Sequence, residues 1–168
     1  MKNQKELVIT LEKALKFSGF SSIVITKNES NMYLIECKKI YNYKIYAFLR
    51  SIGKSGWSNK PEIRRVQIAA FDVDRLIPSG DQHTCMIIGI QELLDKDIFV
   101  VWNVYNYGLH KTNRSCYVKV TNLFKGFLQG YFSTTDSNQK IWISDSYNID
   151  KLLNEYLNFN KSSLGDMM

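Results

Sequence analysis

Short strand-like segments follow one another along most of this chain, and they constrain its fold more than any other feature. They are rich in Ile, Val, Tyr, Phe and Trp, several alternate apolar and polar residues, and Asn, Gly, Ser or Asp separate them. The segments are 22–26, 32–40, 43–52, 63–73, 85–91, 98–103, 115–121 and 140–144. Many strands at short spacing, with few helices between them, predict a mostly antiparallel barrel or barrel-like sheet.

Three helices interrupt this pattern. The clearest spans residues 4–17, where five apolar residues recur at helical spacing and Gly19 follows as a C-terminal cap. Shorter helices are predicted at 122–128, closed by Gly130, and at 148–157. We therefore expect an N-terminal helix (1–20) packed on a barrel (21–157), followed by a polar tail or linker (158–168).

The chain has the size and apolar content of a folded domain: 168 residues, 45% hydrophobic and 13% aromatic. It shows no signal-peptide pattern and no apolar run long enough to cross a membrane. Its three cysteines are widely spaced, which argues against a disulfide framework. The sequence has no CxxC pair and two histidines, which argues against a structural zinc site. We expect a cytoplasmic protein without disulfides, structural zinc or other cofactors.

Positive charge is concentrated in two stretches of a chain whose net charge is +6. Residues 50–65 hold Arg50, Lys54, Lys60, Arg64 and Arg65 against one acid, Glu62. Residues 105–119 contain His110, Lys111, Arg114 and Lys119 and no acid. This segregation favours an anionic partner such as nucleic acid.

The first basic stretch combines a loop with a strand. In the strand EIRRVQI, alternation places Val66 and Ile68 toward a core and Arg65 and Gln67 outward. The loop before it carries further candidates for DNA contact, namely Lys54, Ser55, Trp57, Ser58, Asn59 and Lys60. Arginine reads guanine, Gln and Asn read adenine, and Lys and Ser bind phosphates, whereas a tryptophan packs on sugar or base. The alternative is an ordinary polar strand face with a solvated loop tip.

The second basic stretch repeats this arrangement between the segments 98–103 and 115–121. Its candidates are Asn106, Tyr107, His110, Lys111, Asn113, Arg114 and Ser115. They combine hydrogen-bond donors with aromatic faces, which suits nucleic acid. Alternatively, Tyr105 and Tyr107 cover the end of the barrel and the histidine is structural.

These two stretches also resemble a known family. EIRRVQI after a Gly/Ser/Lys loop, then FVVWNVYNYGLHKTNRSCYVKV and LFKGFLQG, are similar to the B3-like DNA-recognition pseudobarrel of bacterial restriction proteins, as in the EcoRII, BfiI, NgoAVII and LlaJI recognition domains. The likeness covers residues 43–157. The matching positions are Glu62, Arg64 or Arg65, Gln67, Trp102, Asn103 and Ser115.

The resemblance implies an open pseudobarrel of about seven strands with short helices, to which the N-terminal helix is an addition. It also implies two arms, 54–65 and 106–115, that grip the major groove of double-stranded DNA. In such a grip, the residues that bind phosphates would be Lys54, Lys60, Lys111 and Arg50. The residues that contact bases would be Arg64 or Arg65, Gln67, Asn59, Asn113 and Arg114. The chain would be the sequence-specific module of a restriction-modification or phage-defence system. It would not be an enzyme by itself, and a fused or associated nuclease or motor domain would act with it.

Two other classes stay open. Glu36-Cys37-Lys38 fits half of the motif of Mg²⁺-dependent PD-(D/E)xK nucleases, which need a second carboxylate; Glu6, Glu12 and Glu29 are the upstream candidates. Asp72 and Asp74 form a weaker candidate metal pair. A protein-interaction module is the remaining alternative, and the salt dependence of DNA binding separates it from a DNA reader.

Overall fold

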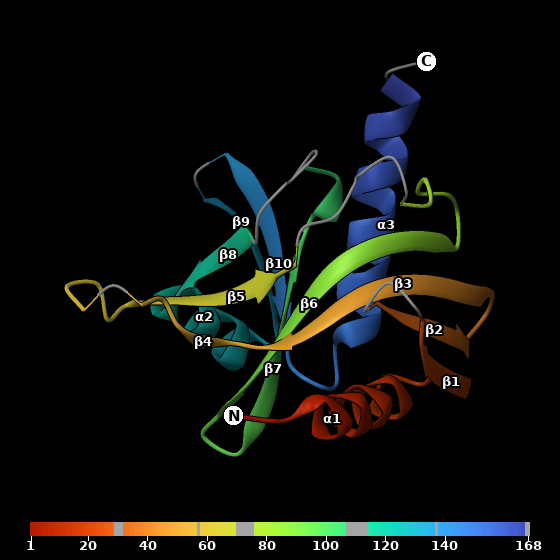
Figure 1. The fold of residues 1–168 in the computed structure, drawn as a ribbon. Coiled ribbons are helices and arrows are strands. Elements are labelled where there is room, and N and C mark those ends of the chain that lie inside the picture. Colours follow the sequence, from red (N-terminus) through yellow and green to blue (C-terminus); the bar gives the residue numbers. More distant parts are fainter. Residues whose placement is uncertain (29–31, 57, 70–75, 107–113, 137, 167–168) are drawn as a thin grey trace.

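The structure is a computed structural model that describes residues 1–166 except 29–31, 57, 70–75, 107–113 and 137. A seven-stranded sheet with the order β1-β2-β3-β6-β7-β10-β9 forms its centre (Figure 1). The strands are β1 Ser21–Lys27, β2 Tyr33–Lys38, β3 Asn42–Ser51, β6 His83–Leu93, β7 Lys96–Trp102, β10 Gln139–Ser144 and β9 Tyr131–Asp136. Neighbours pair antiparallel except β3 and β6, which run parallel. The parallel pair requires a crossover between β3 and β6.

A second, three-stranded sheet has the antiparallel order β4-β5-β8. Its strands are β4 Gly53–Lys54, β5 Ile63–Ile68 and β8 Arg114–Lys119. Strands β4 and β5 belong to the crossover from β3 to β6, and the loop between them projects at one end of the molecule (Figure 1). We call this sheet the small sheet.

The described residues also form three α-helices, α1 Gln4–Phe17, α2 Val120–Gln129 and α3 Ile149–Asp166, and a 3-10 helix, η2 Val104–Asn106. Helix α1 begins with a capping box, in which the Asn3 side chain accepts from the Glu6 amide at 2.9 Å. Gly19 follows it at φ +97°, and Gly130 ends α2 at φ +79°. Both glycines adopt the left-handed backbone that stops a helix.

The seven-stranded sheet separates two hydrophobic cores. Alternation along β6 turns Met86 and Ile88 toward a core shared with α1 and α3, and Cys85 and Ile87 toward a core shared with the small sheet and α2. The result is a three-layer arrangement in which the small sheet covers one face of the central sheet. The small sheet is therefore mounted on a packed core and is not a free hairpin.

Gly89 of β6 allows the two sheets to approach closely. A Cβ at this position would lie 2.7 Å from Ile52 Cγ1, 2.8 Å from Trp102 Cζ3 and 3.0 Å from Val66 Cγ1. These distances are shorter than carbon–carbon van der Waals contact. Because glycine has no Cβ, β5 and the β3–β4 connection can pack directly on β6.

The chain pattern predicted most elements. The N-terminal helix and the mostly-strand composition are confirmed, and each strand-like segment contains a strand of the structure. The expected barrel-like arrangement is found in a coarser form: the described residues form an open seven-stranded sheet and a three-stranded sheet but no closed barrel, since the edge strands β1 and β9 do not pair with each other. The finer expectation, a B3-like open pseudobarrel, stays a prediction. Strands β4 and β9 were not expected, and Val120 and Thr121 belong to α2 where a strand was predicted.

Helix α3 continues to Asp166, so most of the segment 158–168, which was expected to be a polar tail or linker, is helical. One tertiary contact and one contact within the helix support its greater length. The Phe159 ring centroid lies 5.3 Å from the Trp142 ring centroid of β10, and the buried Asn160 side chain donates to the Tyr156 carbonyl one turn earlier in α3 at 3.2 Å. No helix within the described residues is both long and apolar enough to cross a membrane.

Candidate nucleic-acid interface

The small sheet is uniformly basic. Its strands carry Lys54, Arg64, Arg65, Arg114 and Lys119 and contain no Asp or Glu. The acid nearest in sequence is Glu62, which precedes β5 and whose backbone carbonyl accepts from the Val120 amide at 2.7 Å. The charge segregation seen along the chain thus becomes a single basic surface element in space.

Burial divides the small sheet into two faces. Val66, Ile68, Cys116 and Val118 are at most 2% exposed and contact the central sheet's core. The alternate residues form the opposite surface, which we call the outer face; it consists of Arg65, Gln67, Ser115, Tyr117 and Lys119. In the register of β5 with β8, Arg65 lies opposite Tyr117, and Gln67 lies opposite Ser115.

The two adjacent arginines have different surroundings. Arg65 is on the outer face, and its guanidinium lies against Gly56, where a Cβ would be 3.2 Å from Nη2. Gly56 has φ +90°, so this turn favours glycine both for its backbone and for the space that Arg65 occupies. Arg64 instead donates from Nη1 to the carbonyls of Pro61 and, at 3.3 Å, Ile63. Both arginines are half-buried, but Arg65 lies on the outer face beside Gly56, whereas Arg64 donates to the loop carbonyls.

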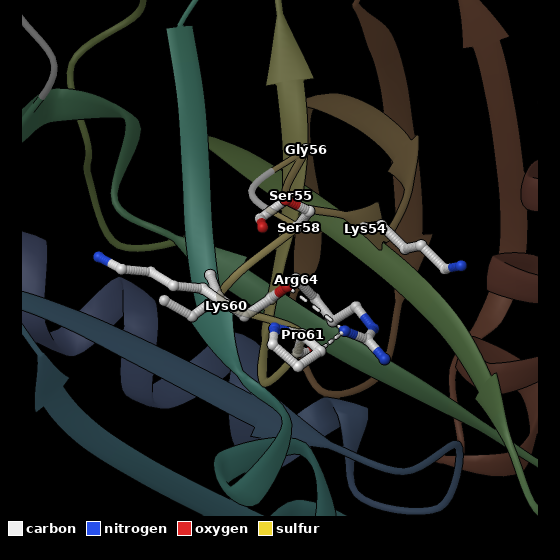
Figure 2. Close-up of a pocket in the computed structure, with 8 residues that line it drawn as sticks. Lys54, Ser55, Gly56, Ser58, Lys60, Pro61 and Arg64 are labelled. Atoms are coloured by element: carbon white, nitrogen blue, oxygen red, sulfur yellow. Dashed lines mark hydrogen bonds between the residues drawn. The ribbon is translucent and has the colours of Figure 1, made fainter.

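The β4–β5 loop encloses a pocket of about 400 Å³ (Figure 2). It is lined by Lys54, Ser55, Gly56, Ser58, Lys60, Pro61, Ile63 and Arg64. Figure 2 shows Lys54 and Lys60 extending in opposite directions from the loop, with Arg64 beside Pro61. Two ammonium groups at the rim and serine hydroxyls between them are groups that bind phosphate oxygens.

Trp102 connects the central sheet to the small sheet. Its side chain is 1% exposed, and its indole Nε1 donates to the backbone carbonyl of Tyr117 at 2.9 Å. The next residue, Asn103, is also buried; its Oδ1 accepts from the Tyr105 amide at 3.2 Å and from the Tyr156 hydroxyl at 3.3 Å. The adjacent residues Trp102 and Asn103 are therefore buried residues that stabilise the candidate interface from the core side.

We expect Trp102→Phe to lower the free energy of unfolding by about 1–2 kcal/mol, because it removes this hydrogen bond and leaves unfilled volume. In this variant, the increase in amide exchange rate relative to the unaltered protein should be larger in β8 than in β7, as measured by native-state hydrogen exchange. Trp142→Phe is the matched control, since Trp142 is equally buried but lies in the core beneath α3. Equal exchange in β8 for the two variants would contradict a specific anchoring function of Trp102.

The second basic stretch is described only at its ends. Asn106 is exposed at the end of η2, Arg114 is exposed at the start of β8, and Ser115 is half-buried. Trp57 in the first stretch and Tyr107, His110, Lys111 and Asn113 in the second lie outside the described residues. The Tyr105 hydroxyl donates to the Ile77 carbonyl at 2.6 Å and accepts from the Cys85 amide at 2.9 Å, so this tyrosine is structural.

The described ends of the two basic stretches lie at opposite ends of the β5–β8 ladder. The pair Ile63–Lys119 is at the end next to the β4–β5 loop, and the pair Ile68–Arg114 is at the other end. Five steps along a strand separate these pairs by about 17 Å. Lys60 and Arg114 therefore belong to opposite ends of the outer face.

Ser58, Asn59 and Lys60 are exposed on the β4–β5 loop, and Ser55 is buried beneath it. Arg50 does not join this group. It lies on β3, does not line the pocket, and donates from Nη1 to the Leu49 carbonyl at 2.9 Å. Its guanidinium packs 5.9 Å from the Phe48 ring centroid, and burial lowers its pKa. These contacts make Arg50 a less suitable phosphate ligand than Lys54 or Lys60.

The nuclease half-motif does not acquire its second carboxylate from α1. Glu36 and Lys38 are exposed, whereas Tyr33, Ile35 and Cys37 of the same strand face the core that contains α1. Glu6 and Glu12 are on α1 and hence on the other side of the sheet. Glu29, Asp72 and Asp74 lie outside the described residues. Within the described part of the chain, no three His, Cys, Asp or Glu side chains gather as metal ligands would.

Tyr117 and Lys119 were not among the predicted DNA-contacting residues, although they lie on the outer face beside Arg65 and Gln67. The alternation of apolar and polar residues in RSCYVK could have identified them, because Cys116 and Val118 are buried and Tyr117 and Lys119 are exposed.

Comparison with protein-family models assigns the chain. A model described as Methylase-associated X1 matches residues 41–168. The chain belongs to the Methylase-associated X1 family. The segment shared with this family begins in the turn before β3 and includes the whole small sheet, whereas α1, β1 and β2 precede it. Searches among curated proteins and among solved structures found no match.

Proposed function

We propose that this chain is a B3-like double-stranded DNA-binding domain that recognises a short site through the major groove. The observation that carries this proposal is the small sheet, which bears cations only and presents Arg65 and Gln67 on its outer face. The major groove of B-DNA admits a β-ribbon, and Arg and Gln form bidentate hydrogen bonds with guanine and adenine, respectively.

The positions of the residues suggest which of them would contact bases and which would contact phosphates. Arg65 and Gln67 read bases because they lie on strands held by the core, whereas Lys54 and Lys60 at the rim of the loop pocket bind phosphates. Asn59 is a further base-reading candidate on this loop. The second arm comprises Asn106, Tyr107, His110, Lys111, Asn113, Arg114 and Ser115. It would contact the groove at the far end of the ladder.

The family description supports a restriction-modification context. We infer that the domain supplies sequence specificity to a system that contains a DNA methylase, with a fused or associated nuclease or motor domain as a further partner. The positive charge of the small sheet agrees with a DNA partner, because it would attract the phosphate backbone.

Duplex binding at increasing salt concentration tests the proposal. We expect the logarithm of the association constant to fall linearly with the logarithm of salt concentration, by about 0.9 per neutralised phosphate. Fluorescence anisotropy with a labelled random-sequence duplex measures this slope. Absence of binding at low salt would reject the proposal and favour a protein-interaction module.

We expect Lys60→Ala to weaken binding to all duplex sequences alike and to reduce the salt slope by about one phosphate. Lys60 is exposed at the pocket rim, so its removal should not disturb the core. Lys13→Ala is the matched control, because Lys13 is exposed on α1, which packs on the opposite face of the central sheet. A change in base preference for Lys60→Ala would contradict its assignment to phosphate.

A further inference from the structure

We infer that Tyr117 and Arg65 together read a pyrimidine that carries a C5-methyl group next to a guanine, as in a thymine–guanine or 5-methylcytosine–guanine step. This inference rests on the proposed DNA-binding function. It adds a specificity-determining residue and the chemical identity of part of the site.

The pair is placed by the β5–β8 register, in which Tyr117 is the direct partner of Arg65. Directly paired residues of an antiparallel ladder project from the same face, with Cβ atoms about 4.5–5.5 Å apart. The Tyr117 side chain is 39% exposed although its neighbours Cys116 and Val118 are 0% and 1% exposed. An aromatic residue thus lies on a basic surface, directly opposite Arg65 in the ladder.

Both members of the pair belong to strands that pack on the core. The Tyr117 backbone carbonyl accepts the hydrogen bond from the buried Trp102 indole at 2.9 Å, and the Arg65 guanidinium lies beside Gly56 of the β4–β5 loop. Residues fixed on core-packed strands lose less conformational freedom on binding than loop residues do. Such rigidity suits reading of bases better than general attachment to phosphates.

Chemistry then assigns a base to each side chain. Arginine donates two hydrogen bonds to O6 and N7 of guanine. A tyrosine ring offers an apolar face, and the apolar group that a base presents in the major groove is the C5-methyl of thymine. A methyl group at C5 of cytosine occupies the same position. Adjacent base pairs are about 3.4 Å apart, so side chains of directly paired residues can reach neighbouring bases.

The test uses the full chain and begins with selection of bound sites from a random duplex library. We expect the selected sites to contain a pyrimidine–guanine step. Deoxyuridine then replaces thymine at that step, which removes only the methyl group, and a parallel pair of duplexes compares cytosine with 5-methylcytosine. Loss of the methyl group should weaken binding about three- to five-fold, as expected for one buried methyl.

Variants assign this effect to the ring. Tyr117→Ala should bind the thymine and deoxyuridine duplexes equally while still preferring the guanine. Tyr117→Phe should keep the difference between these duplexes, since it retains the ring and loses only the hydroxyl. Circular dichroism and binding to random duplex verify that each variant is folded.

Three results would overturn the inference: equal binding of methylated and unmethylated duplexes by the unaltered protein, retention of the difference in Tyr117→Ala, or its loss in Tyr117→Phe. The last result would assign the hydroxyl, and not the ring, to recognition. These failures differ from failure of the proposed function, in which the unaltered protein would bind no duplex even at low salt.

Discussion

Arg65→Ala is expected to reduce affinity for the selected DNA site by about 1–3 kcal/mol and to remove discrimination at one base pair. Arg65 lies on the outer face with its guanidinium beside Gly56, so its loss would remove the proposed bidentate contact with guanine. Binding to random duplex should fall much less, because a single charge contributes little to it. Titration of both duplexes at one salt concentration measures the two effects.

Two further variants sharpen this test. Arg65→Lys keeps the positive charge and loses the planar fork, so it should bind random duplex normally and still lose discrimination. Arg64→Ala is the matched control, because the Arg64 guanidinium contacts loop carbonyls and not the outer face. It should weaken cognate and random duplexes alike. If Arg64→Ala changed base preference and Arg65→Ala did not, the assignment of the outward arginine would be wrong.

Gly89→Val is expected to lower the free energy of unfolding by about 3 kcal/mol or more, and Gly89→Ala by about 1–3 kcal/mol. A Cβ at this position meets Ile52, Trp102 and Val66, all at or below 3.0 Å and all buried. Since these side chains connect the two sheets, relief of the overlap must displace β5. Chemical denaturation measures the loss of stability.

Gly53→Ala is the matched control for Gly89. The neighbour of a Cβ at Gly53 is the flexible Met1 side chain at 3.2 Å, so this variant should differ little from the unaltered protein. Combining Gly89→Ala with Ile52→Ala should cost less than the sum of the two single changes, because the smaller side chain makes room for the new Cβ. Additive losses would show that the overlap at Gly89 is relieved elsewhere.

The residues that stabilise the small sheet are distinct from those of the proposed recognition surface. Along β5 and β8, each outer-face residue alternates with a buried one, so Gln67, Tyr117 and Lys119 can change without opening the core. Gly89 and Trp102 hold the small sheet from the other side. A scaffold of this kind would allow base preference to vary while the fold is retained.

Much of the fold was predictable from local pattern. Helix α1 has an uninterrupted apolar stripe and a capping box. Strand β2 alternates buried residues with more exposed ones, and β5 does the same from Val66 to Ile68. These periods depend on backbone geometry and are therefore visible in the chain alone. The same alternation correctly placed Arg65 and Gln67 opposite Val66 and Ile68.

Other elements had weak local signals. The segment YFSTTD of β9 is polar and half-buried, and it becomes a strand because β10 pairs with it. The end of α3 contains Asn, Lys, Ser and Gly, and its helix is supported by the contact of Phe159 with Trp142. In both cases a partner distant in sequence supplies the stabilisation, as is common for marginal segments.

The sequence by itself determined the elements with strong periodicity, the segregation of charge into two stretches and the outward direction of Arg65. Only the tertiary structure decided that β3 and β6 pair in parallel, that the central sheet stays open, and that Tyr117 lies beside Arg65. The physical reason is that side-chain direction follows from local backbone geometry, whereas strand partners depend on which buried surfaces fit together. Gly89 and Trp102 provide that fit, and they bring the basic strands together on one face.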